Sequence, residues 1–145
     1  MINITDKTKC CGCSACVQSC PVKCIDMKED EQGFLYPVID TAACIDCGLC
    51  EKVCPILNPS ASKEPLQVLA AKNRNEEQRL RSSSGGIFIL LAEHIIERGG
   101  VVFGARFNEK WEVEHCYAET IEGLEPLMRS KYVQSYIGNT YKEAE

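Results

Sequence analysis

The sequence has no long apolar run and no excess of positive charge, and both absences narrow the class of protein. No stretch approaches the roughly 20 consecutive apolar residues of a membrane-spanning helix. The opening residues, Met1 to Cys13, contain no apolar run like that of a secretory signal peptide. The formal net charge of −5 argues against a nucleic-acid partner. These features predict a soluble, cytoplasmic protein without a membrane span.

Cysteine, by contrast, is abundant, with 11 in a chain of 145 residues. Eight of them form the pattern C-x2-C-x2-C-x3-C-P twice, each copy ending at a proline. The first cysteine run comprises Cys10, Cys13, Cys16 and Cys20, and the second comprises Cys44, Cys47, Cys50 and Cys54. This is the spacing of bacterial ferredoxins. It predicts two 4Fe–4S clusters, single-electron transfer and a low-potential, anaerobic setting.

The position of the fourth cysteine in each run predicts how the clusters are ligated. Three thiolates separated by two residues lie along one tight loop, so their sulfurs can converge on one cubane. The fourth cysteine points away and, in two-cluster ferredoxins, ligates the other cluster. We therefore predict crossed ligation, with cluster 1 held by Cys10, Cys13, Cys16 and Cys54, and cluster 2 by Cys44, Cys47, Cys50 and Cys20. Gly12 and Gly48 lie inside the loops, where a missing Cβ permits close backbone approach.

Disulfides and zinc are the alternatives for such cysteines. Disulfides need an oxidising compartment, and zinc sites usually show two C-x2-C pairs. Two runs of four cysteines, each followed by proline, favour iron–sulfur clusters over both. Of the remaining cysteines, we expect Cys11 to pack near a cluster, Cys24 to be a small buried apolar residue, and Cys116 to lie in the core.

The pattern along the chain predicts an α+β protein with two parts. Residues 1–59 form the dicluster ferredoxin domain, residues 60–65 a linker rich in proline and small polar residues, and residues 66–145 a small α/β domain. In the first part we expect strands over Ile2–Thr5, Cys24–Met27 and Phe34–Ile39, the last two forming a hairpin between the cysteine runs.

Apolar periodicity in the second part predicts alternating strands and helices. A mostly buried helix over Ile87–Ile96 begins at the serines before it and ends at Gly99 and Gly100. The other predicted elements are strands over Gln67–Ala71, Val101–Phe107, Trp111–Tyr117 and Tyr132–Gln134, and helices over Asn75–Arg81 and Thr120–Met128, the latter with Thr120 as N-cap.

A second candidate site precedes the predicted buried helix, at Ser82-Ser83-Ser84-Gly85-Gly86. Helix N-termini bind phosphate through free N–H groups and the helix dipole. Lys72, Arg74, Arg79 and Arg81 add positive charge just upstream. The phosphate of a flavin or nucleotide fits such a site, whereas ordinary N-capping by serine is the alternative interpretation.

Four stretches of the second part resemble the coenzyme F420 hydrogenase/dehydrogenase beta subunit family. They are Ala70–Asn73, Arg81–Gly86, Glu97–Ala105 and Arg129–Ser135. The resemblance implies a flavin-dependent redox protein in which FAD exchanges electrons with iron–sulfur clusters and a deazaflavin or another acceptor. It places Ser83, Ser84, Gly85, Gly86, Ser130, Lys131, Tyr132 and Gln134 near the flavin or its substrate.

Members of that family are much longer, so we expect this chain to correspond to their N-terminal part, without the C-terminal remainder. The first functional hypothesis is an iron–sulfur electron-transfer module of a flavin-dependent oxidoreductase, whose partner is a redox protein or a flavin or deazaflavin coenzyme. The second is a standalone ferredoxin-type electron carrier or docking module without catalytic activity. A zinc-stabilised interaction domain is a third hypothesis. The sequence assigns no catalytic residues.

Overall fold

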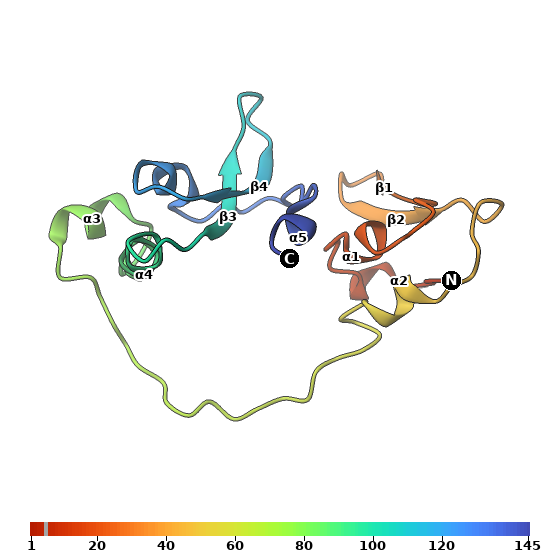
Figure 1. Cartoon of the computed structure of the whole chain (residues 1–145), viewed down its shortest axis with the longest axis horizontal. Helices are drawn as coiled ribbons and strands as arrows, with labels where there is room; N and C mark the ends of the chain where they lie inside the picture. Colours follow the sequence, from red (N-terminus) through yellow and green to blue (C-terminus); the bar gives the residue numbers. More distant parts are fainter. Residues whose placement is uncertain (5) are drawn as a thin grey trace. The chain divides into compact units, whose positions relative to one another are not determined.

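The computed structural model describes residues 1–4 and 6–145 and contains two compact units. Unit 1 comprises Met1–Lys63 together with Tyr141–Glu145, and unit 2 comprises Glu64–Thr140 (Figure 1). The boundary between Lys63 and Glu64 falls within the segment predicted as a linker. Short helices and antiparallel strands occur in both units, which confirms the α+β class. In the described part of the chain, no helix combines the length and apolar character needed to cross a membrane.

Unit 1 is built from short elements around the predicted hairpin. These are the 3-10 helix η1 (Lys7–Lys9), α1 (Ala15–Gln18), β1 (Ile25–Glu29), β2 (Leu35–Ile39) and α2 (Leu49–Lys52). Strands β1 and β2 pair antiparallel, with Ile25 opposite Ile39. The Asp30 carboxylate closes the turn by accepting hydrogen bonds from the N–H groups of Gln32 and Phe34. The hairpin prediction is therefore confirmed.

The two cysteine loops of unit 1 repeat the same backbone conformation. Gly12 and Ser14 have φ values of 63° and 59°, and the residues at the same places in the second run, Asp46 and Gly48, have 52° and 73°. Each loop then enters a one-turn helix, α1 or α2, that contains the third cysteine of its run. The left-handed residues turn the chain sharply, and they permit three cysteines to face one side of each loop.

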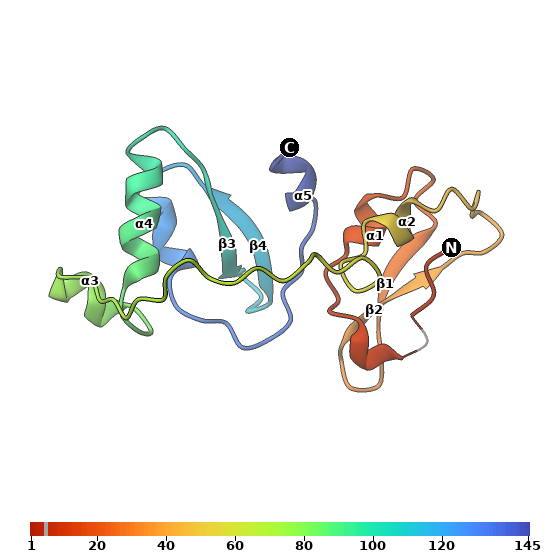
Figure 2. The same cartoon turned by 90° about the horizontal axis from the view of Figure 1, so that it is seen from below.

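Unit 2 contains α3 (Glu76–Arg81), α4 (Ile87–Ile96), β3 (Val102–Phe107), β4 (Val113–Ala118) and the 3-10 helix η2 (Glu122–Leu127), and α5 spans Thr140–Glu143 at the unit boundary. Strands β3 and β4 form an antiparallel hairpin, and α4 packs beside β3 (Figure 2). Leu124 of η2 is fully buried in the core, against Ile89 and Ala92 of α4. Asn75 caps α3 by accepting a hydrogen bond from the Gln78 N–H.

Helix α4 has the predicted bounds but not the predicted burial. Only Ile89 and Ala92 are buried, whereas Phe88, Leu91 and Ile95 on the same helix are exposed. The prediction of a mostly buried helix was therefore wrong, because too few elements of unit 2 pack around it. The N-cap is Gly86, with φ of 71° and no side-chain cap, so the prediction that serine begins the helix was also wrong.

Three predicted strands are absent from the described residues. Residues 2–4 are not in a strand, and Thr5 lies outside the described residues. No β-ladder forms at Gln67–Ala71 or Tyr132–Gln134, because no neighbouring strand supplies hydrogen-bond partners for their backbone. Near the second of these segments, Tyr136 instead forms an isolated β-bridge with Glu114. The helix expected over Thr120–Met128 is the shorter 3-10 helix η2, which contains Pro126 and has Ile121 as N-cap.

Candidate metal centres

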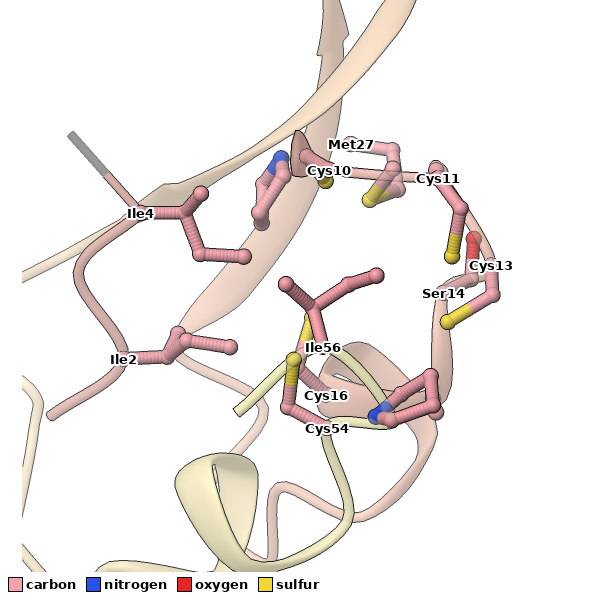
Figure 3. A pocket seen from close by; sticks show the side chains of 14 residues that line it. Ile2, Ile4, Cys10, Cys11, Cys13, Ser14, Cys16, Met27, Cys54 and Ile56 are labelled. Carbon is pink, nitrogen blue, oxygen red and sulfur yellow. The ribbon is translucent and has the colours of Figure 1, made fainter. Parts of the chain in front are cut away.

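The first cavity of unit 1 is surrounded by cysteines from both runs. Cys10, Cys13 and Cys16 from the first run and Cys54 from the second line the same space (Figure 3). The cavity contains about 340 Å³ of empty space, part of it open to solvent. Its remaining walls are mainly apolar and include Ile2, Ile4, Met27, Pro37 and Ile56. Cys11 also lines this cavity, beside the three cysteines of its own run.

The second cavity has the reciprocal composition. It is lined by Cys44, Cys47 and Cys50 from the second run and by Cys20 from the first. Its empty space of about 320 Å³ is close to that of the first cavity. Apolar walls again predominate, provided by Val22, Ile25, Ile39 and Ile45. The structure thus gathers the same two sets of four cysteines that the spacing predicts as ligand sets.

The short helices bring the fourth cysteine of each run to the opposite cavity. Cys20 and Cys54 follow directly after α1 and α2, and their N–H groups bond the carbonyl oxygens of Val17 and Glu51. One helical turn separates each of them from the loop of its own run. Because α1 packs against α2, the end of each helix lies near the other loop.

The donor set of each cavity consists of thiols. All eleven cysteines are free thiols. Across residues 1–4 and 6–145, no three or more His, Cys, Asp or Glu side chains converge on one ion position. A zinc ion holds its thiolates at about 2.3 Å and so draws them together, whereas each cysteine of a cubane binds a different iron. Four cysteines around one cavity suit a cubane, which has one iron for each of them.

Burial and hydrogen bonding set the electrostatics of the thiols. Burial raises the pKa of the Cys16 thiol to about 11, and it also raises the pKa of Cys13. Thiolate is the form that binds metal, so cluster binding at these positions releases protons. Around the second cavity, backbone N–H groups donate to sulfur, from Ile2 to Cys50 at 3.3 Å and from Asp46 to Cys44 at 3.4 Å.

Cys24 is a residue of the second cavity that the sequence did not identify. It was predicted to be a small buried residue, and it is 6% exposed. Its sulfur, however, lines the second cavity and lies 3.5 Å from the sulfur of Cys20. Burial, followed by the hydrogen bond with Cys20, raises the pKa of the Cys24 thiol to about 12. The signal in the sequence that could have placed Cys24 at this cavity is its position four residues after Cys20, a predicted ligand.

The two stretches of unit 2 predicted to bind flavin lie next to one another. The hydroxyl oxygens of Ser83 and Ser130 are 3.4 Å apart. The Arg129 side chain donates a hydrogen bond from Nε to the carbonyl oxygen of Arg81 at 2.9 Å. Two contacts thus join residues 47 and 48 positions apart in the chain.

Several residues of these stretches have structural contacts. Lys131 donates from Nζ to the carbonyl oxygens of Pro126 and Met128, at 2.9 and 2.6 Å. A Cβ on Gly85 would lie 2.8 Å from the Ala71 carbonyl oxygen, so close backbone packing accounts for this glycine. Tyr132 is 93% exposed, Ser84 is exposed, and Gln134 is half-buried. A role for these residues in binding flavin stays a prediction.

Comparison with known families identifies the cysteine-rich unit. Residues 9–57 match the model of the 4Fe-4S dicluster domain, a range that includes both cysteine runs and the hairpin between them. A search of curated proteins found no match. Residues 9–57 therefore form a ferredoxin-type domain, which supports an iron–sulfur electron-transfer role. The match does not extend to the second part of the chain, where the resemblance to the coenzyme F420 family stays a prediction.

Proposed function

We propose that unit 1 binds two 4Fe–4S clusters with crossed ligation and exchanges single electrons with a flavin or deazaflavin partner. The observation that carries the proposal is the composition of the two cavities. Each is bounded by the first three cysteines of one run and the fourth of the other. When bound, such clusters take up and release one electron at a time.

The residues around the cysteines support this role. Ile2, Ile4 and Met27 at the first cavity, and Ile25 and Ile39 at the second, limit the access of water. Cys16, Cys50 and Cys54 are themselves buried, which protects the inner ligand positions from solvent. N–H groups directed at sulfur stabilise thiolate charge in the low-dielectric interior.

For the flavin, we propose a surface at the start of α4, defined by Ser83, Ser84, Gly85, Gly86 and Ser130. Helix α4 has no side-chain cap, so its first N–H groups can bond a phosphate. The contact between Ser83 and Ser130 adds two hydroxyls at one place. Together with the family resemblance, these features favour an electron-transfer module of a flavin-dependent oxidoreductase.

The alternative is a ferredoxin-type carrier that docks to a separate redox protein. The hydrogen bonds of Lys131 favour this alternative, because its ammonium already donates to two carbonyl oxygens of unit 2. Gly85 likewise has a packing role that requires no cofactor. In this case unit 2 supports docking, and unit 1 alone carries electrons.

Anaerobic preparation of the full chain, followed by iron, sulfide and flavin analysis, tests both proposals. We expect about eight irons and a matching amount of acid-labile sulfide, since two cubanes hold four irons each. Retention of FAD supports the oxidoreductase module, and its absence with full iron supports the carrier. Zinc without sulfide would contradict both. Cys116→Ala, outside both cavities, is the control and should keep the full iron content.

A further inference from the structure

The Cys24 side chain interacts with two predicted ligands of the second centre, Cys20 and, more weakly, Cys44. Its sulfur lies 3.5 Å from the Cys20 sulfur, and its backbone N–H also donates to that sulfur at 3.4 Å. The residue is buried and lines the second cavity, so solvent does not compete strongly for the thiol. The thiol and the backbone N–H of Cys24 therefore both contact the Cys20 sulfur.

The internal duplication provides a comparison within the same chain. Asn58 follows Cys54 by four residues, as Cys24 follows Cys20. The Asn58 side chain donates to the carbonyl oxygens of Glu51 and Cys54, at 2.6 and 3.2 Å. Asn58 is also exposed. At the equivalent position of the second run, the Asn58 side chain thus donates its hydrogen bonds to backbone oxygens and not to sulfur.

The first cavity also has a cysteine outside the predicted ligand set, Cys11. Unlike Cys24, Cys11 is exposed, so water competes for any hydrogen bond that its thiol makes. A buried S–H group in a low-dielectric site interacts more strongly with a nearby charge than an exposed one. Cys24 is therefore the stronger candidate for influencing a cluster.

We propose that the Cys24 thiol donates a hydrogen bond to the Cys20 sulfur and raises the reduction potential of the second centre. This inference rests on the proposed crossed ligation, in which Cys20 is a thiolate and can only accept. Cys24 lies outside the predicted ligand set, so its S–H group is the available donor. Hydrogen bonds to ligand sulfur are one of the protein's controls on cluster potential, because they stabilise the more negative, reduced form. Cys24 thus acts through Cys20 as a positioning residue.

The proposal is tested by redox titration of the anaerobically reconstituted full chain, with EPR detection of each centre. We expect Cys24→Ala to change the one-electron equilibrium of one centre by up to about tenfold, a lowering of about 59 mV. Cys24→Ser, which keeps a donor, should retain most of the wild-type potential. The shifted centre should be the one whose signal Cys47→Ser perturbs. Cys116→Ala is the matched control and should shift neither potential.

The outcomes separate this inference from the proposed function. If the wild-type chain binds no iron and sulfide, both fail. If it binds two clusters and Cys24→Ala shifts neither potential, or shifts both equally, only the role of Cys24 is overturned. If Cys24→Ala loses about four irons while Cys20→Ala keeps its full iron content, Cys24 is the ligand in place of Cys20. This result would also overturn the proposed role of Cys24. If the alanine variant loses iron by collapse, Cys24→Val fills the space without a donor and is titrated in its place.

Discussion

Ile25 and Ile39 face each other across the β1–β2 hairpin, and both line the second cavity. Two residues further along the same strands, Met27 is paired with Pro37, and both line the first cavity. Side chains two residues apart lie on one face of a strand. One face of a single hairpin therefore provides a wall for each predicted metal centre.

The hairpin wall leads to a first prediction. Ile25 is 2% exposed, so Ile25→Ala should lower the free energy of unfolding by about 2–4 kcal/mol and increase the rate of cluster loss. Val38→Ala is the control, because Val38 is 44% exposed and lies on the opposite face of the strand. Val38→Ala should change the free energy of unfolding by less than about 0.5 kcal/mol. Denaturant titration of the reconstituted chain measures both, and equal costs would contradict the assigned wall.

Crossed ligation leads to the second prediction. Cys20→Ala should damage the centre that contains Cys44, Cys47 and Cys50, and leave the other spectroscopically intact. Cys54→Ala should do the reverse. Iron content and EPR spectra of the two variants provide the measurement. Loss of the centre belonging to the mutated residue's own run would show that each run holds its own cluster.

The left-handed residues of the cysteine loops lead to the third prediction. Gly48 has φ of +73°, a conformation that is strained for any residue with a Cβ, so Gly48→Ala introduces backbone strain. We expect a loss of about 1–2 kcal/mol in stability. Ser14→Gly, at the same place in the first loop, should instead stabilise the chain by up to about 1 kcal/mol, because relief of left-handed strain exceeds the entropic cost of glycine. Thermal unfolding of the reconstituted variants measures both, and shifts of the same sign would contradict this explanation.

Lys131 leads to the fourth prediction. Its ammonium donates to the carbonyl oxygens of Pro126 and Met128, so Lys131→Met should destabilise unit 2 by about 1.5–3 kcal/mol. Ser130→Ala should change stability by less than about 0.5 kcal/mol, because its hydroxyl is exposed. If the surface at α4 binds flavin, Ser130→Ala should weaken flavin retention without this loss of stability. Hydrogen exchange in unit 2, with flavin titration, distinguishes the two effects.

Elements with strong local signals were predicted closely. The turn at Asp30 and the alternating residues around it specify β1 and β2, and the bounds of α4 match its apolar run. The predicted strand Gln67–Ala71 shows the limit of such reasoning, because an apolar pattern makes a strand only where a neighbour supplies hydrogen bonds. The exposure of Phe88 and Leu91 has a similar cause, since periodicity indicates an apolar face and not what covers it.

The sequence alone determined the chemistry of unit 1, because cysteine spacing within one loop is a local property of the chain. It also determined where each loop turns, through residues such as Gly12 and Gly48 that tolerate positive φ. Only the tertiary structure decided that one hairpin face lines both cavities and that the Cys24 sulfur touches the Cys20 sulfur. These relationships depend on the packing of α1 against α2 and of the hairpin against both loops. Spacing along the chain does not specify how these elements pack in space.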